Sequence, residues 1–219
     1  TIEPGRILDG LLPESADLPK NRIYRVRPDI PPGNQTVDIS SEVGDGEGSA
    51  AEIYGQYDKD WSEWPWQEGA PFEDKNQNGI YEPSIDIPGV PGADQTIWSV
   101  ARDVPNVDWG FGTPPLGVEI HMTIWGYRSE GALGYMFFRR YALINRNSIP
   151  FDSMFVAMWS DPDDGNAGDD LAGCDTSRSL GFVYNGEETD KRYSPLPPPA
   201  VGFDFFQGQI VAGSPPDSA

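Results

Sequence analysis

The stretch LGVEIHMTIW, residues 116–125, decides the fold class. Apolar residues occupy every second position from Leu116 to Ile124, and Gly117, Glu119, His121 and Thr123 lie between them. This period of two predicts a β-strand with one face buried. The segment YMFFRRYALI, residues 135–144, follows it and is apolar on both faces. That pattern is typical of a central strand in a β-sandwich.

Further signals lie on both sides of this core. Strands are expected at residues 22–27, 151–159, 180–184 and 201–206. The 25 glycines and 22 prolines supply the turns between them. A short helix is expected over residues 50–60, and Pro65 stops its continuation. We therefore predict a mainly β protein: an antiparallel β-sandwich with long Gly/Pro-rich acidic loops and little helix.

The chain also changes in composition along its length. Residues 1–50 are rich in proline and poor in core signal, so we expect an extended N-terminal segment there. Residues 51–219 are expected to form the β-sandwich domain, with two acidic loops of the calcium-binding type. The chain begins at Thr1 and shows no signal peptide, so we expect a processed product or a fragment of something longer.

Charge and composition exclude several classes of partner. The formal net charge is −20, from 35 acidic and 15 basic residues, which argues against nucleic acids and anionic membrane surfaces. No stretch approaches the length of apolar sequence that a membrane span needs. Aromatic residues make up 12% of the chain, so the acidity does not indicate disorder. The single cysteine rules out an intrachain disulfide.

The most specific motif is DKNQNGIYEPSID, residues 74–86. Oxygen-bearing side chains recur at alternate positions, and Gly79 then permits a sharp turn. Calcium prefers six to eight hard oxygen ligands, and this spacing can fold several of them around one ion. The predicted ligands are Asp74, Asn76, Asn78, the carbonyl of Ile80, Glu82 and, in place of a glutamate at the twelfth position, Asp86. The alternative is a surface loop whose Asp and Asn side chains only form Asx turns.

A second acidic stretch, DPDDGNAGDDLAGCD, covers residues 161–175. Its carboxylates repel one another unless a cation lies among them. Oxygen ligands without histidine or thiolate favour Ca²⁺ over Zn²⁺ or Cu²⁺. The candidate ligands are Asp161, Asp163, Asp164, Asp169, Asp170 and Asp175. The alternative is a solvated acidic loop. Together the two stretches predict one or two bound Ca²⁺ ions.

Two weaker signals concern carbohydrates. Trp61, Trp64 and Trp66 could form a platform that stacks on sugar rings, although such a cluster more often packs under a loop. Ser153 and Ser218 each follow an aspartate and precede an apolar residue, which resembles short O-glycosylation sites of Bacteroidota. Pairs of carboxylates are also numerous, but none sits in a recognisable acid and nucleophile arrangement.

Several segments together resemble a group of large secreted proteins of the Bacteroidota and Ignavibacteria lineage. They occur in the order WPWQEGAPFEDKNQNGIYEP, LGVEI, FFRRYALINR, WSDPDDGNAGDDLAGCDTSRSLGFVYNG and PPAVGFDFFQG. The resemblance covers roughly residues 60–210. Members of that group carry a C-terminal sorting domain for type IX secretion, and their function is uncharacterised. The resemblance therefore implies export to the cell surface or the medium.

These observations favour a non-enzymatic protein. The leading prediction is a calcium-stabilised extracellular structural or adhesive module, such as a subunit of a cell-surface layer or filament, which self-associates or binds other cell-surface proteins. The alternative is a polysaccharide-binding module that uses the cluster Trp61–Trp66. The third possibility is a glycan-active enzyme. No nucleic acid partner and no membrane span are expected.

Overall fold

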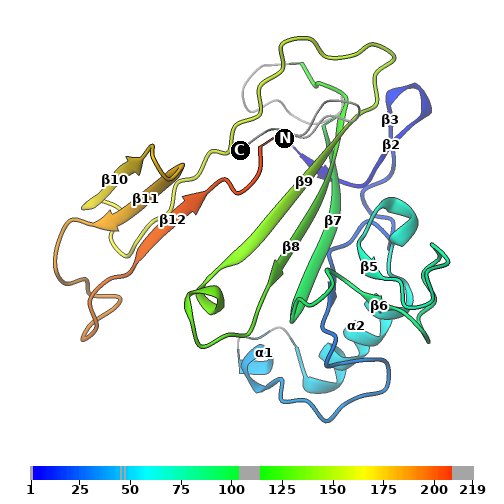
Figure 1. Ribbon diagram of the computed structural model, residues 1–219, viewed down its shortest axis with the longest axis horizontal. Coiled ribbons are helices and arrows are strands. Elements are labelled where there is room, and N and C mark those ends of the chain that lie inside the picture. The colour runs from blue at the N-terminus through cyan, green and yellow to red at the C-terminus, as the bar shows by residue number, and fades with distance from the viewer. Residues whose placement is uncertain (1, 45, 47, 104–113, 209–219) are drawn as a thin grey trace. The chain divides into compact units, whose positions relative to one another are not determined.

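The computed structural model describes residues 2–44, 46, 48–103 and 114–208 (Figure 1). The protein is mainly β, with antiparallel sheets and little helix. The chain divides into two compact units, Thr1–Phe151 and Asp152–Ala219. Within unit 1, strands of the N-terminal segment pair with the main sheet. In the described residues, no helix has the length and apolar character required to cross a membrane.

A five-stranded antiparallel sheet forms the centre of unit 1. Its strands run in the order β1, β7, β8, β9, and β4 pairs with β7 beside β1. The bounds are β1 Glu3–Pro4, β4 Tyr24–Val26, β7 Gln95–Asp103, β8 Val118–Gly126 and β9 Phe137–Asn145. Residues of β8 pair along their whole length with both neighbours, so that Val118 lies opposite Asp103 and Asn145. The stretch that starts at residue 116 is therefore the central strand of this sheet.

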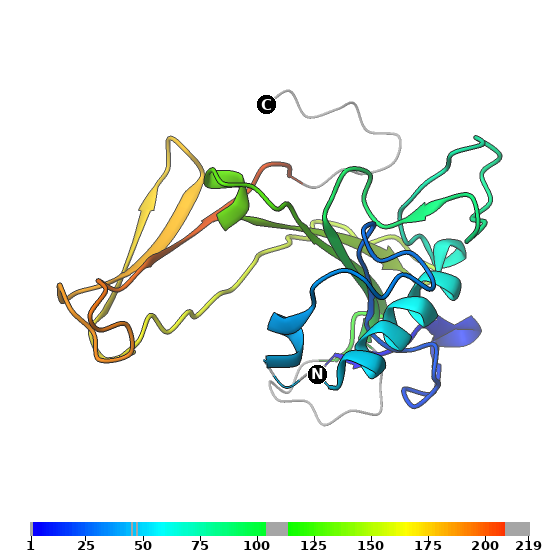
Figure 2. The ribbon, with the colours of Figure 1, turned by 90° about the horizontal axis from the view of Figure 1, so that it is seen from below.

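Shorter elements surround the sheet. The two small hairpins are β2 Ile7–Leu8 with β3 Leu12–Pro13, and β5 Phe72–Glu73 with β6 Ile87–Pro88. The helices are α1 Ser40–Gly44 and α2 Ala50–Ser62, and single 3-10 turns cover Asp9–Leu11, Trp66–Glu68 and Ala132–Tyr135. The predicted helix forms where it was expected, and it begins with a capping box in which Ser49 and Glu52 satisfy each other's backbone N–H groups. Figure 2 shows α2, in cyan, lying along the sheet.

The buried face of β8 carries its polar side chains. Glu119, His121 and Thr123 are buried, whereas Ile120 and Met122 are only half-buried. The periodicity of two is confirmed, but the apolar positions are not on the more deeply buried face. The reason lies in the layer that covers this face: a cluster of large aromatic rings from β4, α2 and the following loops packs there. Its buried members are Tyr24, Val26, Trp61, Trp64, Ala70, Tyr81 and Trp98.

Glu119 links three distant parts of unit 1. Its side chain is fully buried and accepts hydrogen bonds from the backbone N–H of Ile7 (3.0 Å) and from Arg146 (2.8 and 3.1 Å). Arg6 and His121 also contact the carboxylate, at 3.4 and 2.6 Å. Burial alone would raise the pKa of Glu119, but these hydrogen bonds and charges outweigh it and hold the pKa at about 2. The carboxylate is thus a charged junction between the N-terminal segment, β8 and the turn after β9.

Strand β9 is far more exposed than the sequence predicts. Phe137, Tyr141 and Leu143 are all exposed, although the segment was expected to be buried on both faces. The strand pairs with β8 on one side only, and no described strand pairs with its other edge. The prediction of a central strand is therefore wrong for β9: it is the edge strand of the sheet.

Unit 2 consists of an antiparallel sheet in the order β10, β11, β12. Its strands are β10 Asp170–Asp175, β11 Leu180–Asn185 and β12 Ala200–Asp204. The last two match the predicted strands. The prediction of a strand at residues 151–159 is wrong, because this segment forms no ladder in the structure. Most of its apolar side chains are exposed, and Phe155 is 92% exposed. The β-propensity of a segment does not make it a strand without a partner.

Candidate metal centre

The predicted calcium loop is the connection between β5 and β6, and its base is anchored in the aromatic core. Phe72 of β5 packs edge-on against Tyr81 of the loop, with ring centroids 5.5 Å apart. The Tyr81 hydroxyl donates a hydrogen bond of 2.7 Å to the carbonyl of Trp61 at the end of α2. The loop therefore has a fixed root and an exposed tip, and Figure 2 shows it, in blue-green, extending from unit 1.

Two aspartates organise the backbone of the loop. Asp74 accepts hydrogen bonds from the N–H groups of Asn78 (3.2 Å) and Gly79 (2.7 Å). Asp86, with 1% of its surface exposed, accepts from the N–H groups of Lys75 (2.9 Å) and Glu82 (2.7 Å). Gly79 has the positive φ of 75° that the tight turn needs, as predicted. Asp74 and Asp86, the first and last candidate ligands, thus hold the loop closed through backbone hydrogen bonds without a bound ion.

Three other candidate ligands meet at one point. The side-chain amides of Asn76 and Asn78 lie 2.6 and 2.8 Å from the same oxygen of Glu82. The oxygen and nitrogen of an amide group exchange places when the group turns over. In this structure the amide oxygens accept from the backbone N–H groups of Asn78 (3.3 Å) and Ile80 (2.7 Å), and the amide nitrogens face Glu82. A cation at this point would find the Glu82 carboxylate and, once rotation of the amides has replaced those two hydrogen bonds, two amide oxygens. These are the hard, flexible oxygen ligands that Ca²⁺ prefers.

The remaining candidates of this loop complete the set only in part. Ile80 projects its side chain to solvent, which fits a residue that would contribute a carbonyl oxygen alone. Ile85, at the position where a glutamate is usual, is exposed as well. Each oxygen of Asp86 already accepts one hydrogen bond but keeps a second lone pair that can face a cation. The donor set therefore fits calcium with two carboxylates, two amides, one carbonyl and the more remote Asp86.

The second predicted site is not brought together as a whole. Asp170 and Asp175 are the two ends of β10, which places them roughly 16 Å apart, so they cannot share an ion. Asp161 and Asp163 are exposed on the preceding segment, while Asp164 is buried. The composition of the acidic stretch predicts one loop because Asp and Gly disfavour strands, but pairing with β11 makes residues 170–175 a strand. A single ion bound by all six aspartates is therefore excluded.

Asp175 has a local role instead. Its carboxylate accepts hydrogen bonds from the N–H (3.0 Å) and hydroxyl (2.6 Å) of Ser177, and Arg178 lies 3.6 Å away. This geometry is an Asx turn that connects β10 with β11. Asp175 thus shapes the hairpin, and the remaining candidates of this stretch lie at its other end.

The tryptophan cluster does not form a sugar-stacking platform. Trp61 and Trp64 are 4% and 3% exposed and belong to the core. Their ring N–H groups donate to the carbonyls of Pro83 (3.0 Å) and Pro71 (2.8 Å). Trp66 keeps some exposure but packs edge-on against Phe72. Trp61 and Trp64 therefore satisfy their ring N–H groups internally and are buried, so only Trp66 of the predicted platform keeps some exposure.

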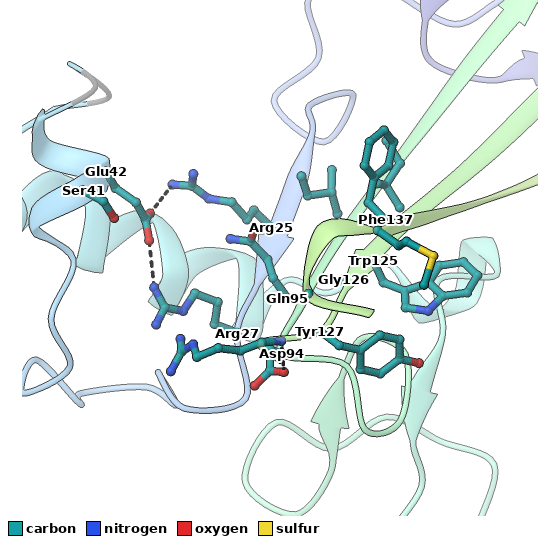
Figure 3. A pocket seen from close by; sticks show the side chains of 15 residues that line it. Arg25, Arg27, Ser41, Glu42, Asp94, Gln95, Trp125, Gly126, Tyr127 and Phe137 are labelled. Carbon is teal, nitrogen blue, oxygen red and sulfur yellow. Dashed lines mark hydrogen bonds and ion pairs between the residues drawn. The ribbon is translucent and has the colours of Figure 1, made fainter. Parts of the chain in front are cut away.

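A pocket of about 530 Å³ lies at the other end of the main sheet (Figure 3). Trp125, Tyr127 and Phe137 form its aromatic side, and Arg25 of β4 and Arg27 just after β4 form its basic side. Arg25 and Arg27 both form ion pairs with Glu42 of α1, at 3.2 and 2.9 Å. The sequence does not reveal this pocket, because its lining comes from five separate segments and no short motif contains it.

Only one of the two predicted glycosylation sites lies within the described residues. Ser153 is exposed, has a positive φ of 56° and lies on no strand, whereas a strand start was expected there. Ser218 lies outside the described residues.

No three His, Cys, Asp or Glu side chains of the described part converge closely enough to hold a metal ion by themselves. Metal binding in the 74–86 loop therefore depends on its asparagine and carbonyl oxygens in addition to its carboxylates. Comparison with protein-family models, with curated proteins and with solved structures finds no match for this chain.

Proposed function

We propose that the protein is a calcium-stabilised extracellular structural or adhesive module. The observation that carries this proposal is the convergence of Asn76 and Asn78 on Glu82, inside a loop that Asp74 and Asp86 hold closed. A surface loop of Asx turns needs the backbone hydrogen bonds, but it does not need two side-chain amides that both donate to one oxygen of Glu82. That extra feature favours a cation site over the purely structural alternative.

A bound ion would contribute to folding because the site exists only in the folded chain. The ligands from Asp74 to Asp86 span one hairpin connection, and their backbone oxygens are in place only when Tyr81 is packed in the core. Ligand binding to the folded state alone adds about 2.7 kcal/mol at a concentration of 100 dissociation constants. Calcium would therefore stiffen an exposed loop that has few apolar contacts of its own beyond Tyr81.

An extracellular location is consistent with this chemistry. Calcium sites of extracellular modules tolerate dissociation constants of about 10⁻⁴–10⁻³ M, because calcium is abundant there. A loop with only two or three carboxylates suits that range. The sequence resemblance to type IX secretion substrates points to the same place. We propose export to the cell surface or the medium.

Assembly with other surface proteins or with further copies is the second part of the proposal. Apolar side chains of β9 are exposed in unit 1, and unit 2 has exposed apolar residues on its sheet as well. Exposed apolar surface of this extent is characteristic of contact surfaces. We also propose the β-sandwich that the sequence predicts. Its support is that the five-stranded sheet of unit 1 and the three-stranded sheet of unit 2 are antiparallel and carry apolar side chains.

The decisive experiment measures calcium binding to the 74–86 loop. Asp74→Ala removes a predicted ligand and two backbone hydrogen bonds, and Ser84→Ala changes an exposed residue of the same loop as a matched control. Isothermal titration of chelator-treated protein should show a binding event in the parent and in Ser84→Ala that Asp74→Ala lacks. Thermal unfolding should shift upward with CaCl₂ more than with NaCl of equal ionic strength, because NaCl only screens charge.

Two results would contradict the proposal. One is an equal calcium stoichiometry in the parent and in Asp74→Ala. The other is a thermal shift that is the same for CaCl₂ and NaCl. Either result would leave the loop as an Asx-turn structure. Sedimentation velocity with and without calcium tests the proposed assembly. A protein that stays monomeric at all concentrations and does not interact with other surface proteins would contradict the assembly part of the proposal.

Polysaccharide binding is the second candidate function, and the pocket in Figure 3 favours it. Trp125 and Tyr127 offer aromatic rings, and nearby arginines offer donors for hydroxyl or carboxylate groups. Affinity electrophoresis through acidic polysaccharides should retard the parent but not Trp125→Ala. Tyr135→Ala, which removes an exposed aromatic ring outside the pocket lining, is the matched control. Equal mobility of all three proteins in every gel would eliminate this candidate.

A further inference from the structure

Unit 2 contains a buried carboxylate that lacks the partners such a group requires. Asp164 is 2% exposed, and neither of its carboxylate oxygens makes a hydrogen bond. One oxygen each of Asp169 and Asp170 is also buried without a hydrogen-bond partner. Among the described residues, no Lys, Arg or His forms an ion pair with any of the three. Burying a carboxylate without a partner is strongly unfavourable, so the arrangement calls for a compensating group.

The main chain of Asp164 is held in place from two sides. Its N–H donates to the other oxygen of Asp170 at 2.9 Å, and its carbonyl accepts from the side chain of Asn185 at 3.2 Å. Asn185 is at the end of β11 and is itself buried. The backbone of Asp164 is thus fixed by two strands, and only the carboxylate remains without a partner. This is how a protein positions a ligand-binding side chain in advance.

A fourth carboxylate approaches the same turn. A Cβ atom at Gly165 would lie 2.6 Å from Cγ of Asp190, so only glycine permits this approach, and its φ of 95° requires glycine as well. Asp190 is 9% exposed and comes from the loop after β11. The hydroxyl of Tyr193 lies near both Asp164 and Asp190. The carboxylates of Asp164 and Asp190 therefore both lie at the turn that contains Gly165.

We propose that Asp164, Asp170 and Asp190 hold a Ca²⁺ ion in unit 2. The donors are carboxylate oxygens, with no histidine or thiolate among them, which favours a hard cation. Ca²⁺ tolerates irregular geometry and keeps water ligands, whereas Mg²⁺ demands a near-ideal octahedron. The three carboxylates are not gathered at metal-binding distances in the described structure. Binding therefore draws the side chains of Asp170 and Asp190 towards Asp164, whose backbone is already fixed.

This site is independent of the 74–86 loop in unit 1, and the experiment separates the two. Calcium titration is carried out on the full chain with Asp74→Ala as the background, so that the loop of unit 1 does not contribute. That variant should bind one Ca²⁺ per chain, and the further change Asp164→Asn should remove it. Asp161→Asn, an exposed aspartate of the same segment, is the matched control and should leave the binding unchanged.

A second measurement remains informative if Asp164→Asn fails to fold. Tb³⁺ replaces Ca²⁺ and emits when a nearby tyrosine is excited, so Tyr193→Phe should remove most of the emission in the Asp74→Ala background. Asp190→Asn should weaken Ca²⁺ binding at least about tenfold. The proposal is overturned if Asp74→Ala is folded and binds no calcium, or if Asp164→Asn or Asp190→Asn binds it as the background does. It is also overturned if calcium leaves the melting temperature of the background unaffected.

Discussion

Replacing Glu119 by glutamine tests the buried charge network of unit 1. The substitution keeps the shape of the side chain but removes the charge that Arg146, Arg6 and His121 surround. It also weakens the hydrogen bond that the backbone N–H of Ile7 donates. We expect the variant to fold with a lower free energy of unfolding, because a buried pair that loses one partner leaves the other partners poorly compensated.

The size of the effect follows from the pKa of Glu119. Its value falls from 4.5 for the free side chain to about 2 in the fold, and the side chain is fully buried, so solvent screening is small. At about 1.4 kcal/mol per pKa unit, the charged form stabilises the fold by about 3 kcal/mol near neutral pH. Because the folded pKa is depressed, this stabilisation is complete above the unfolded pKa and is lost as the pH falls towards 2.

Urea unfolding of the parent and of Glu119→Gln, followed by tryptophan fluorescence, measures this contribution. The difference in unfolding free energy should be about 3 kcal/mol near pH 7 and about 1 kcal/mol near pH 3. Comparison at each pH cancels the general destabilisation of an acidic protein in acid. A difference below about 1 kcal/mol near pH 7, or one that is equal at the two pH values, would refute the reasoning.

Three further substitutions test the packing and the local geometry of unit 1. Trp64→Ala should lower the unfolding free energy by about 3–5 kcal/mol in the same urea assay, because it opens a cavity in the aromatic core; a loss below about 1 kcal/mol would contradict the burial. Gly89→Ala places a Cβ 2.8 Å from the hydroxyl oxygen of Thr96, whereas Gly92→Ala meets open space at a similar positive φ, so Gly89→Ala should destabilise more; equal losses would show that only backbone strain matters. Ser49→Ala should cost about 1 kcal/mol and fray the start of α2 in hydrogen exchange, and unchanged protection there would count against the capping box.

Features that depend on local sequence could be predicted. Helix α2 has its cap and its stop within the segment itself, and the loop from Asp74 to Asp86 carries its spacing in thirteen consecutive residues. The turn at Gly79 has the positive φ that the pattern requires. Strand β8 follows from its alternation in the same way. In each case the determining interactions join residues that are close in the chain.

Features that depend on distant partners could not be predicted. Glu119 is buried because Arg6, Ile7 and Arg146 reach it, and none of them is its neighbour in sequence. Strand β7 was missed because its buried face carries Thr96 and Arg102 as well as Trp98, so an apolar alternation is absent.

The acidic stretch shows the same limit. Asp and Gly favour a loop at residues 170–175, and only the partner strand β11 makes this segment β10. Conversely, residues 151–159 have the composition of a strand but no pairing partner among the described residues. The buried state of Asp164 could not be predicted either, since it depends on Asn185 and on the loop that contains Asp190.

The pairing of β1 with β7 has a kinetic consequence. Glu3 and Arg102 meet across 99 residues of chain, whereas the strands β7, β8 and β9 pair with near neighbours. Closing such a long loop costs more chain entropy than closing a hairpin, and distant contacts slow folding. We therefore expect the hairpins to form first and β1 to dock late, although its residues leave the ribosome before β7, β8 and β9 do. Strand β1 is therefore expected to pair with β7 only after most of unit 1 has folded.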